Sequence, residues 1–306
     1  MKAVKFDKYG GVDVLEVREV EDPVAGPGEV LVAVKAASIN PGEMAIREGF
    51  LDARWPATFP SGEGSDFAGI VDAVGAGVDE FEIGDEVIGW TEQRASQAEL
   101  VVAPLEQVTA KPAGVSWEVA GALFVAPMAA WASIEAVDLK PGEIVVISAA
   151  AGGVGSIAVQ LAHARGATVV GLASERNHQW LRDHGAIPVA YGEGQVERIK
   201  HAVGEHLDAF IDTFGGGYVE LAANELGIPL ERINTIADFE AVERLGVSSQ
   251  GTHAIATREI LAELAAMVVA GELEIPIAKT YPLSEVRAAY EELARRDTRG
   301  KIVLLT

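Results

Sequence analysis

One stretch of the chain decides its fold: Ile144-Val145-Val146-Ile147-Ser148-Ala149-Ala150-Ala151-Gly152-Gly153-Val154-Gly155-Ser156-Ile157-Ala158-Val159-Gln160-Leu161. An apolar run is followed there by a turn of small residues and an amphipathic segment, which predicts a buried strand, a tight turn and a helix. This is the context of a dinucleotide-binding turn, where free N–H groups and the helix dipole meet negative charge. The residues expected to hold the cofactor in this turn are Ala150, Gly152, Gly153, Val154 and Gly155.

Two glycines of this turn have separate roles. At Gly152 a missing Cβ lets a pyrophosphate approach the backbone, and at Gly155 it lets the helix lie close on the strand. Ala150 replaces the first glycine of the usual G-x-G-x-x-G pattern, so the pattern alone is not specific. A close-packed strand-to-helix turn without a ligand is the alternative interpretation.

Strands and helices alternate regularly around the turn, as stacked βαβ units require. The strands are almost continuously apolar, which predicts a doubly wound parallel sheet of the Rossmann type covered on both faces. The expected strands are Ile144–Ser148, Thr168–Ala173, Ile187–Val189, Leu207–Asp212 and Arg232–Ile236.

The rest of the chain predicts a β-rich domain. Short strands such as Glu29–Ala36 and Phe67–Val74 alternate with Gly and Pro turns near the amino terminus. A single strand at the other end needs a sheet to join, so we expect the tail to complete this first domain. The expected division is 1–114 with 255–306, around a cofactor domain of 115–254. The tail elements are expected at Thr257–Ala270, Ser284–Arg296 and Lys301–Leu305.

Composition narrows the classes of partner. The formal charge of −22 over 306 residues repels phosphate backbones and anionic lipid faces, which argues against a nucleic-acid partner. The absence of cysteine excludes disulfides and cysteine-ligated zinc. The amino terminus carries no secretion signal, which favours the cytoplasm. The uncharged run Ile144–Ala162 is interrupted by glycine and serine, so we expect no membrane span.

The end of the second expected strand indicates which nicotinamide cofactor binds. An Asp or Glu about 20 residues after the glycine turn would bind the ribose hydroxyls of NAD, but Ala173 occupies that position. Ser174, Arg176 and Asn177 offer hydroxyl, guanidinium and amide donors to a 2′-phosphate, which favours NADPH. Glu175 is the opposing observation, because a carboxylate aimed at the ribose would favour NADH.

Several further motifs are distributed over essentially the whole chain. They include Ala36-Ala37-Ser38-Ile39-Asn40-Pro41-Gly42-Glu43, Gly64-Ser65-Asp66-Phe67-Ala68-Gly69, Val74-Gly75-Ala76-Gly77-Val78, Ile211-Asp212-Thr213-Phe214-Gly215-Gly216 and Arg299-Gly300-Lys301-Ile302-Val303-Leu304. No single motif is specific, but their order and spacing together resemble one family, the zinc-independent quinone oxidoreductase, or zeta-crystallin-like, group of the medium-chain dehydrogenase/reductases. The resemblance implies a GroES-like catalytic domain beside the Rossmann domain and NADPH-dependent reduction of quinones or enones.

The same resemblance indicates no metal site. Zinc-dependent relatives have a cysteine where this chain has Asn40 and a Gly-His-Glu triplet where it has Gly64-Ser65-Asp66. The six histidines are scattered away from these motifs, and we interpret them as surface or packing residues. Quinones and α,β-unsaturated carbonyls suit such a site, because they accept a hydride without a Lewis acid.

Further site residues follow from the residues and the resemblance. Asn40 is the expected catalytic residue and cofactor contact, whose amide would donate to the substrate oxygen or fix the nicotinamide; an ordinary Asn-Pro turn is the alternative. Similarity to the family implies that Phe214 and Gly215 lie at the cofactor ribose. It also implies that Thr235 and Ile236 contact the nicotinamide amide through their backbone.

Departures from the family leave the substrate open. A tyrosine of some members is Ala45 here, and a threonine of the first cofactor-domain helix is Ala129. Phe50, Trp55 and Phe59 would line a flat apolar slot or serve as packing residues. The alternatives are therefore an enone, enal or enoyl reductase of the same fold, or a low-turnover NADPH-binding sensor or structural protein.

Likeness to the family also implies a homodimer. The cofactor domains of two copies would pair through their edge strands near Gly246–Gly251, because an unpaired strand edge invites such an extension.

Overall fold

In the computed structural model, which describes residues 1–306, the chain forms two units. The first unit joins Met1–Val125 to Thr257–Thr306, and the second is Ala126–Ala256. The first boundary follows Val125 rather than residue 114, because the short helix α2 (Trp117–Ala120) packs on strands of the first unit. Gly121, directly after α2, accepts a hydrogen bond from Ser38 N–H at 2.9 Å.

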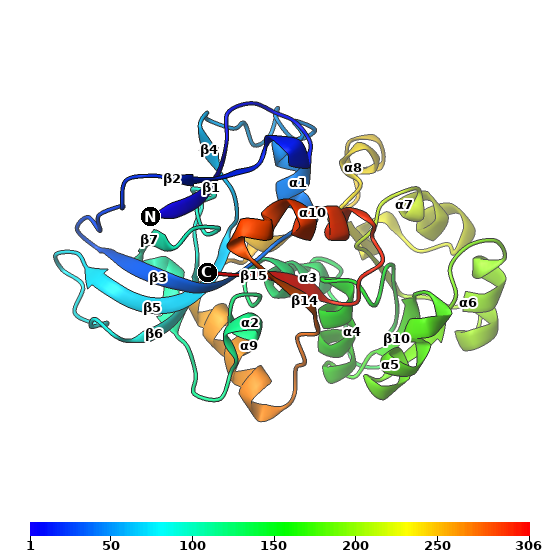
Figure 1. Cartoon of the computed structure of the whole chain (residues 1–306). Coiled ribbons are helices and arrows are strands. Elements are labelled where there is room, and N and C mark those ends of the chain that lie inside the picture. The colour runs from blue at the N-terminus through cyan, green and yellow to red at the C-terminus, as the bar shows by residue number, and fades with distance from the viewer. The chain divides into compact units, whose positions relative to one another are not determined.

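The second unit is built on a five-stranded parallel sheet, which appears in green and yellow in Figure 1. Its strand order, β11-β10-β9-β12-β13, is that of a doubly wound Rossmann-type sheet. The order reverses between β9 and β12, so the carboxyl ends of these two strands form the topological switch point where ligands bind in such sheets. The strands are β9 (Ile144–Ile147), β10 (Thr168–Leu172), β11 (Ala186–Val189), β12 (Ala209–Asp212) and β13 (Ile233–Thr235).

The strands of this sheet are buried, as their apolar runs predict. Val146, Val170, Phe210 and Ile233 have no exposed side-chain surface and pack in one core. Each expected strand forms within two residues of its expected bounds. The helices of the unit are α3 (Val125–Ala136), α4 (Gly155–Ala164), α5 (His178–Asp183), α6 (Gln195–Val203), α7 (Tyr218–Glu220) and α8 (Phe239–Leu245).

The first unit contains a seven-stranded sheet and a three-stranded sheet. In the larger sheet the order is β14-β15-β3-β5-β6-β8, and β7 pairs with β3. The smaller sheet has the order β2-β1-β4. The strands are β1 (Lys2–Phe6), β2 (Glu16–Glu19), β3 (Glu29–Ser38), β4 (Ser61–Gly62), β5 (Asp66–Val74), β6 (Glu86–Trp90), β7 (Leu100–Pro104), β8 (Val108–Ala110), β14 (Ile277–Pro282) and β15 (Lys301–Leu305).

The tail completes the first unit, which confirms the expected GroES-like domain closed by the C-terminal segment. Strand β15 pairs antiparallel with β3, placing Val303 opposite Ser38, and the red β15 lies beside the blue β3 in Figure 1. Helix α9 (Arg258–Ala270) is capped by the Thr257 hydroxyl. The expected helix Ser284–Arg296 is shorter: a single turn of 3-10 helix precedes α10 (Val286–Ala294). The remaining helix of this unit is α1 (Pro41–Arg47).

Two other expectations concern surfaces. No helix of the protein is both long and apolar enough to cross a membrane. Residues 246–251 do not form a strand. Within them, Ser248 makes an isolated parallel bridge to Asn234 of β13. The expected pairing of copies at this edge would therefore involve a very short segment.

Candidate active site

The turn after β9 is held by close packing. Ala149 adopts a left-handed conformation with φ 43°, which turns the chain sharply out of the strand. A Cβ on Gly155 would lie 2.2 Å from the Ala149 carbonyl oxygen, so no larger residue fits where α4 begins. A Cβ on Gly152 would meet the same oxygen at 3.2 Å, a tight but tolerable distance. The need for glycine is therefore much stronger at position 155.

The backbone N–H groups of this turn fall into two sets. Those of Ala150 and Gly152 donate within the protein, to Leu172 O at 3.0 Å and to Ala149 O at 2.8 Å. Ala150 is also fully buried, so its side chain packs beneath the turn. Gly153, Val154 and Gly155 precede or open α4, where N–H groups lack an intrahelical acceptor. The expectation that these three residues bind an anion stays a prediction of the turn.

The residues expected to choose the cofactor lie together after β10. Glu175–Asn177 form one turn of 3-10 helix, and Ser174 precedes it. The Asn177 amide donates to the Ser174 hydroxyl at 3.2 Å. Arg176 is exposed, as is Glu175, while Ala173 is buried. The turn thus carries the Arg176 cation beside the neutral side chains of Ser174 and Asn177. The Glu175 carboxylate belongs to the same turn.

Asp212 ties the strand ends at the switch point together. Its buried carboxylate accepts hydrogen bonds from the Ser148 hydroxyl at 2.6 Å and from the Thr235 hydroxyl at 2.7 Å. It also accepts the N–H groups of Phe214 and Gly215, each at 3.0 Å. The carboxylate therefore fixes the segments that follow β9, β12 and β13 in one arrangement.

The four remaining expected contacts lie on these fixed segments. Phe214 is 41% exposed and packs edge-on against Tyr218, and Gly215 adopts φ 81°. Thr235 is fully buried, and its hydroxyl donates to the Asp212 carboxylate. The N–H of Ile236 donates to Asp212 O at 3.1 Å.

In the first unit, Asn40 caps α1 at the end of β3. The chain is extended at Asn40 and Pro41 starts the helix, an arrangement that favours helix initiation. The Glu43 carboxylate accepts the Asn40 N–H at 2.9 Å, which is one half of a capping box. The Asn40 amide nitrogen donates to Glu43 at 3.0 Å and to Asp66 at 2.8 Å. Its oxygen accepts from the Lys301 ammonium.

This arrangement bears on the expected role of Asn40. Both amide hydrogens are engaged by carboxylates and the oxygen by a cation, so the side chain is held rigidly. It is also buried. To donate to a substrate oxygen, Asn40 would have to release one of these two carboxylates.

Five ionisable side chains gather around Asn40, and we call them the buried charge cluster. Three are acidic and two are basic, and none is more than 6% exposed. They come from α1, from the segment beside β4, from β5 and from β15. The members are Glu43, Arg47, Glu63, Asp66 and Lys301.

Two of the acids have contrasting surroundings. Asp66 accepts the N–H groups of Phe124 and Val125 and the Ser38 hydroxyl, besides the Asn40 amide. Glu63 is paired with Arg47 at 2.5 Å. Burial raises the pKa of Glu63 to about 8, although Arg47 acts in the opposite direction.

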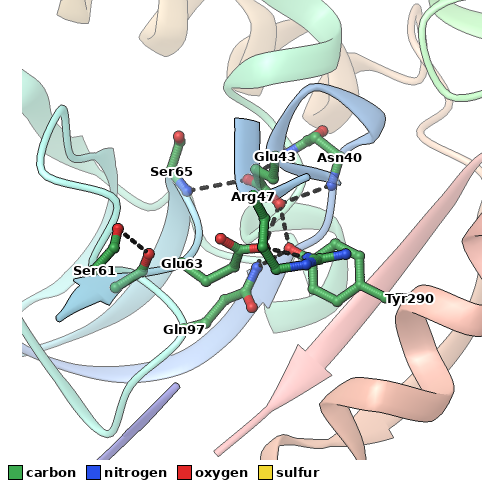
Figure 2. A network of polar contacts seen from close by, with 9 residues as sticks. Asn40, Glu43, Arg47, Ser61, Glu63, Ser65, Gln97 and Tyr290 are labelled. Atoms are coloured by element: carbon green, nitrogen blue, oxygen red, sulfur yellow. Dashed lines mark hydrogen bonds and ion pairs between the residues drawn. The ribbon is translucent and has the colours of Figure 1, made fainter. Parts of the chain in front are cut away.

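Tyr290 of α10 contacts two members of the cluster, Glu43 and Arg47. Figure 2 shows its hydroxyl directed at the Glu43 carboxylate, to which it donates at 2.7 Å, with the Arg47 guanidinium over its ring. Gln97 donates to the same hydroxyl at 2.7 Å and to Glu43 at 3.3 Å. Burial raises the pKa of Glu43 and that of Tyr290, and lowers the pKa of Lys301.

The positions of the missing zinc ligands carry other interactions. Ser65 N–H donates to Glu43 at 3.3 Å, and Asn40 and Asp66 belong to the network described above. No group of three or more His, Cys, Asp or Glu side chains is arranged to hold a metal ion. Where histidine contacts are defined, they are local, as for His178 with Ala173 O and His206 with Asp208.

The aromatic residues after α1 do not share one role. Phe59 packs edge-on against Phe6 and Tyr9 and is 40% exposed. Trp55 is half-buried beside the Arg54 guanidinium, and Phe50 is 79% exposed. Whether the three rings line a flat apolar slot stays a prediction.

Sequence reasoning missed the residues that organise both sites. The sequence motif contains Asp212 but assigns it no role. Its position is the available signal, because a polar residue at the end of an apolar parallel strand marks a switch-point site. Tyr290 and Glu63 carried no local signal. Their partners are separated from them in the sequence, Glu43 by 247 residues from Tyr290 and Arg47 by 16 from Glu63.

Comparison with known proteins agrees with this architecture. Residues 26–122 match the family model of the alcohol dehydrogenase GroES-like domain, and residues 184–304 match that of the zinc-binding dehydrogenases. The quinone oxidoreductase of Pseudomonas aeruginosa is 31% identical over 99% of both chains.

Solved structures give the same result. The quinone oxidoreductase from Coxiella burnetii superposes with a TM-score of 0.88 at 30% identity, over 100% of this chain and 99% of that one. The Escherichia coli quinone oxidoreductase, solved in complex with NADPH, has a TM-score of 0.87 at 27% identity over the whole of both chains. The fold and the matches define a medium-chain dehydrogenase/reductase. Within that superfamily, the chain belongs to the zinc-independent quinone oxidoreductase group.

Proposed function

We propose that this protein is an NADPH-dependent oxidoreductase that transfers a hydride to quinones or related activated carbonyl and enone substrates. The observation that carries the proposal is the switch point of the second unit. There the anion-binding turn Gly153–Gly155 and the strand ends fixed by Asp212 occupy the place where doubly wound sheets bind dinucleotides.

The turn after β10 supports NADPH over NADH. Ser174, Arg176 and Asn177 would hold the 2′-phosphate, with Arg176 supplying a charge-assisted hydrogen bond. The acid that would bind both ribose hydroxyls of NAD is absent at Ala173. Glu175 is exposed in the same turn and has room to point to solvent. The Escherichia coli relative solved with NADPH supports the same assignment.

Bound NADPH supplies a hydride, and the protein supplies binding, orientation and a suitable electrostatic environment. Asp212 holds in place the segments that would contact the cofactor. The contacts would come from Phe214, Gly215 and the carbonyl of Ile236. Asn40 has no thiolate ligand to offer a metal, and Ser65 replaces the histidine of the zinc-dependent relatives. Electrophiles that delocalise the incoming charge, such as quinones and enones, therefore suit this chain.

The test is NADPH oxidation by the purified full-length protein against benzoquinone, phenanthrenequinone, hexenal and methyl vinyl ketone, with a simple aldehyde as the unactivated control and NADH in parallel. Turnover of quinones with NADPH preferred is the expected result. Turnover of the enal and enone alone would make the protein an enone reductase of the same fold. Tight NADPH binding without turnover of any acceptor would favour the sensor or structural role.

We also propose a homodimer in which the edge beside β13, near Ser248, pairs with its copy. The isolated bridge of Ser248 to Asn234 leaves a short stretch of backbone at this edge available for pairing. Light scattering after size-exclusion chromatography should give the mass of two chains, and the mass of one chain would contradict the proposal.

A further inference from the structure

One arginine holds the loop that follows β11, residues 190–194, which we call the β11 loop. The guanidinium of Arg198, in α6, donates to four consecutive carbonyl oxygens of this loop. The distances are 3.1 and 2.8 Å to Ala190, 2.8 Å to Glu193, and 3.4 Å to each of Tyr191 and Gly192. A guanidinium presents five N–H donors in a fixed planar fork, so one side chain can satisfy carbonyl groups along a whole turn. Arg198 therefore fixes the path of the β11 loop.

A glutamine ties the same loop to the segment that follows β12. The Gln195 side-chain oxygen accepts the Gly192 N–H at 3.1 Å and the Tyr218 hydroxyl at 3.5 Å. The Tyr218 ring in turn packs edge-on against Phe214, with 6.0 Å between ring centroids. The segments after β11 and β12 are thereby joined across the ends of β10 and β9, which lie between them in the sheet.

The β11 loop starts beside the turn proposed to hold the 2′-phosphate. Strands β10 and β11 are parallel neighbours with Leu172 opposite Val189, and Ala173 N–H donates to Val189 O at 3.0 Å. Ser174 and Ala190 therefore leave the sheet side by side. The adenine base and the 2′-phosphate of NADPH are attached to adjacent carbons of one ribose. A cofactor whose phosphate lies at the turn after β10 thus carries its base to this part of the sheet edge.

The β11 loop presents an aromatic ring there. The Tyr191 side chain is 57% exposed, although a ring of this size gains free energy by burial. A flat base can stack on such a ring, and every base has a face suited to this contact. Because Arg198 orders the loop before any ligand binds, stacking costs little further conformational entropy.

We propose that Arg198 is a positioning residue for the adenosine end of the cofactor, because it holds the β11 loop so that the Tyr191 ring packs against the adenine base. The inference rests on the proposed function. Arg198 acts through the loop backbone and does not touch the cofactor. NADPH and NADH share the base, so Arg198 contributes equally to the binding of both. Arg176 differs in this respect, since its contact requires the 2′-phosphate.

The test measures the dissociation constants of NADPH and NADH for variants of Arg198 and Tyr191. Arg198→Met removes every side-chain donor to the loop, and both constants should rise about tenfold. Arg198→Lys keeps the charge but not the fork, so it should recover only part of this loss. Tyr191→Ala should raise both constants by a similar factor. Tyr191→Phe, which keeps the ring, should bind both cofactors as the wild type does.

The double variant distinguishes this role from a general structural one. Arg198→Met and Tyr191→Ala remove the same contact with the base, so combining them should weaken binding no further than either change alone. Losses that multiply in the double variant would mean that Arg198 does not act through Tyr191, and would overturn the proposal. If Arg198→Met does not fold, Tyr191→Ala still tests the contact, because its side chain is exposed.

Two matched variants control for charge and for changes elsewhere on the same helix. Arg182→Gln removes one positive charge from an exposed position of α5, and Glu197→Gln alters an exposed position of α6. Both should bind each cofactor within about twofold of the wild type. A tenfold loss in Arg182→Gln as well would make the effect of Arg198 one of net charge, against the proposal.

Adenosine 5′-monophosphate is a further probe, because it carries the base without the nicotinamide or the 2′-phosphate. Its dissociation constant should rise in Arg198→Met by the same factor as that of NADPH. A wild type that binds neither NADPH nor NADH would overturn the proposed function. A wild type that binds NADPH, together with an Arg198→Met variant that keeps its affinity or loses it for NADPH alone, would overturn the positioning role alone.

Discussion

Asp212 and Glu63 are both buried carboxyl groups, one in each unit, but their surroundings differ in kind. Asp212 is surrounded by neutral donors, two hydroxyls and backbone N–H groups from the ends of adjacent strands. Glu63 is paired with a cation inside a cluster that has surplus acid. The difference teaches that burial alone does not define the role of a carboxyl group. Fixed neutral donors make it a scaffold, whereas burial within an unbalanced set of charges favours its protonated form.

The largest effect is expected from Asp212→Asn, which replaces an oxygen acceptor by a donor facing other donors. The free energy of unfolding should fall by about 3 kcal/mol, because buried N–H and O–H groups lose their partners. The NADPH dissociation constant should rise at least about tenfold as the segments after β9, β12 and β13 loosen. Urea denaturation and cofactor titration measure the two effects, with the exposed Glu193→Gln as the control. An unchanged denaturation midpoint would refute the scaffold role.

Glu63→Gln should act through pH. Burial raises the Glu63 pKa from its ordinary 4.5 to about 8 in the folded protein, so the folded chain keeps a proton that the unfolded chain has released between these values. This stabilising contribution is complete below pH 4.5 and is lost as pH rises through 8. The free energy of unfolding should therefore fall by about 1.4 kcal/mol per pH unit through this group.

Denaturation curves from pH 5 to pH 8 test this slope. The difference between wild type and Glu63→Gln should grow across the range in favour of the variant, whereas Glu291→Gln, which removes an exposed carboxyl from α10, should run parallel to wild type. Parallel lines for both variants would mean that Glu63 does not hold a proton in the folded protein.

Asp212 and Glu63 also show which features of the structure can be predicted from the sequence. The strand, turn and helix around Gly155 are encoded locally, so their pattern predicts the Rossmann-type sheet and its switch point. The capping of α1 by Asn40 and Glu43 is likewise a local pattern, three residues apart. Ser148 and Asp212 lie 64 residues apart, and Tyr290 and Glu43 lie 247 apart. Such pairs depend on strand order and on the return of the tail, which no short motif records.

Contacts between residues distant in the chain also determine which atoms of an individual residue are available to a ligand. The motif predicts Ala150 and Gly152 at the cofactor, and the fold pairs their N–H groups with Leu172 O and Ala149 O, so any contact they make with a cofactor would use other atoms. Phe59 packs against Phe6 and Tyr9, two contacts with residues about 50 positions earlier in the chain that no motif near Phe59 predicts. Composition and spacing identify a residue's chemistry, whereas its available donors depend on neighbours that are distant in the chain.

A smaller effect should follow Ser148→Ala, which removes one donor to Asp212 and the acceptor of Thr213 N–H. The free energy of unfolding should fall by about 1–2 kcal/mol, the cost of two modest hydrogen bonds. This loss should be the same at pH 6 and pH 8, since only neutral donors are involved. Ser284→Ala, at an exposed position, is the control. A loss of stability that depends on pH would mean that a titrating group takes part in the hydrogen bonds around Asp212, as in the buried charge cluster.

The smallest effect is expected at the turn after β10, which lacks a hydrogen bond to Asp212 and therefore tests cofactor choice apart from the scaffold. Arg176→Gln should weaken NADPH binding roughly fivefold, because an exposed guanidinium contributes modestly to a 2′-phosphate contact. NADH binding should not change, because NADH lacks that phosphate. Titration of both cofactors measures the ratio, and Arg182→Gln, an exposed arginine on α5, controls for the loss of one positive charge. Equal losses for both cofactors would assign Arg176 a general electrostatic role and leave the preference for NADPH to Ser174 and Asn177.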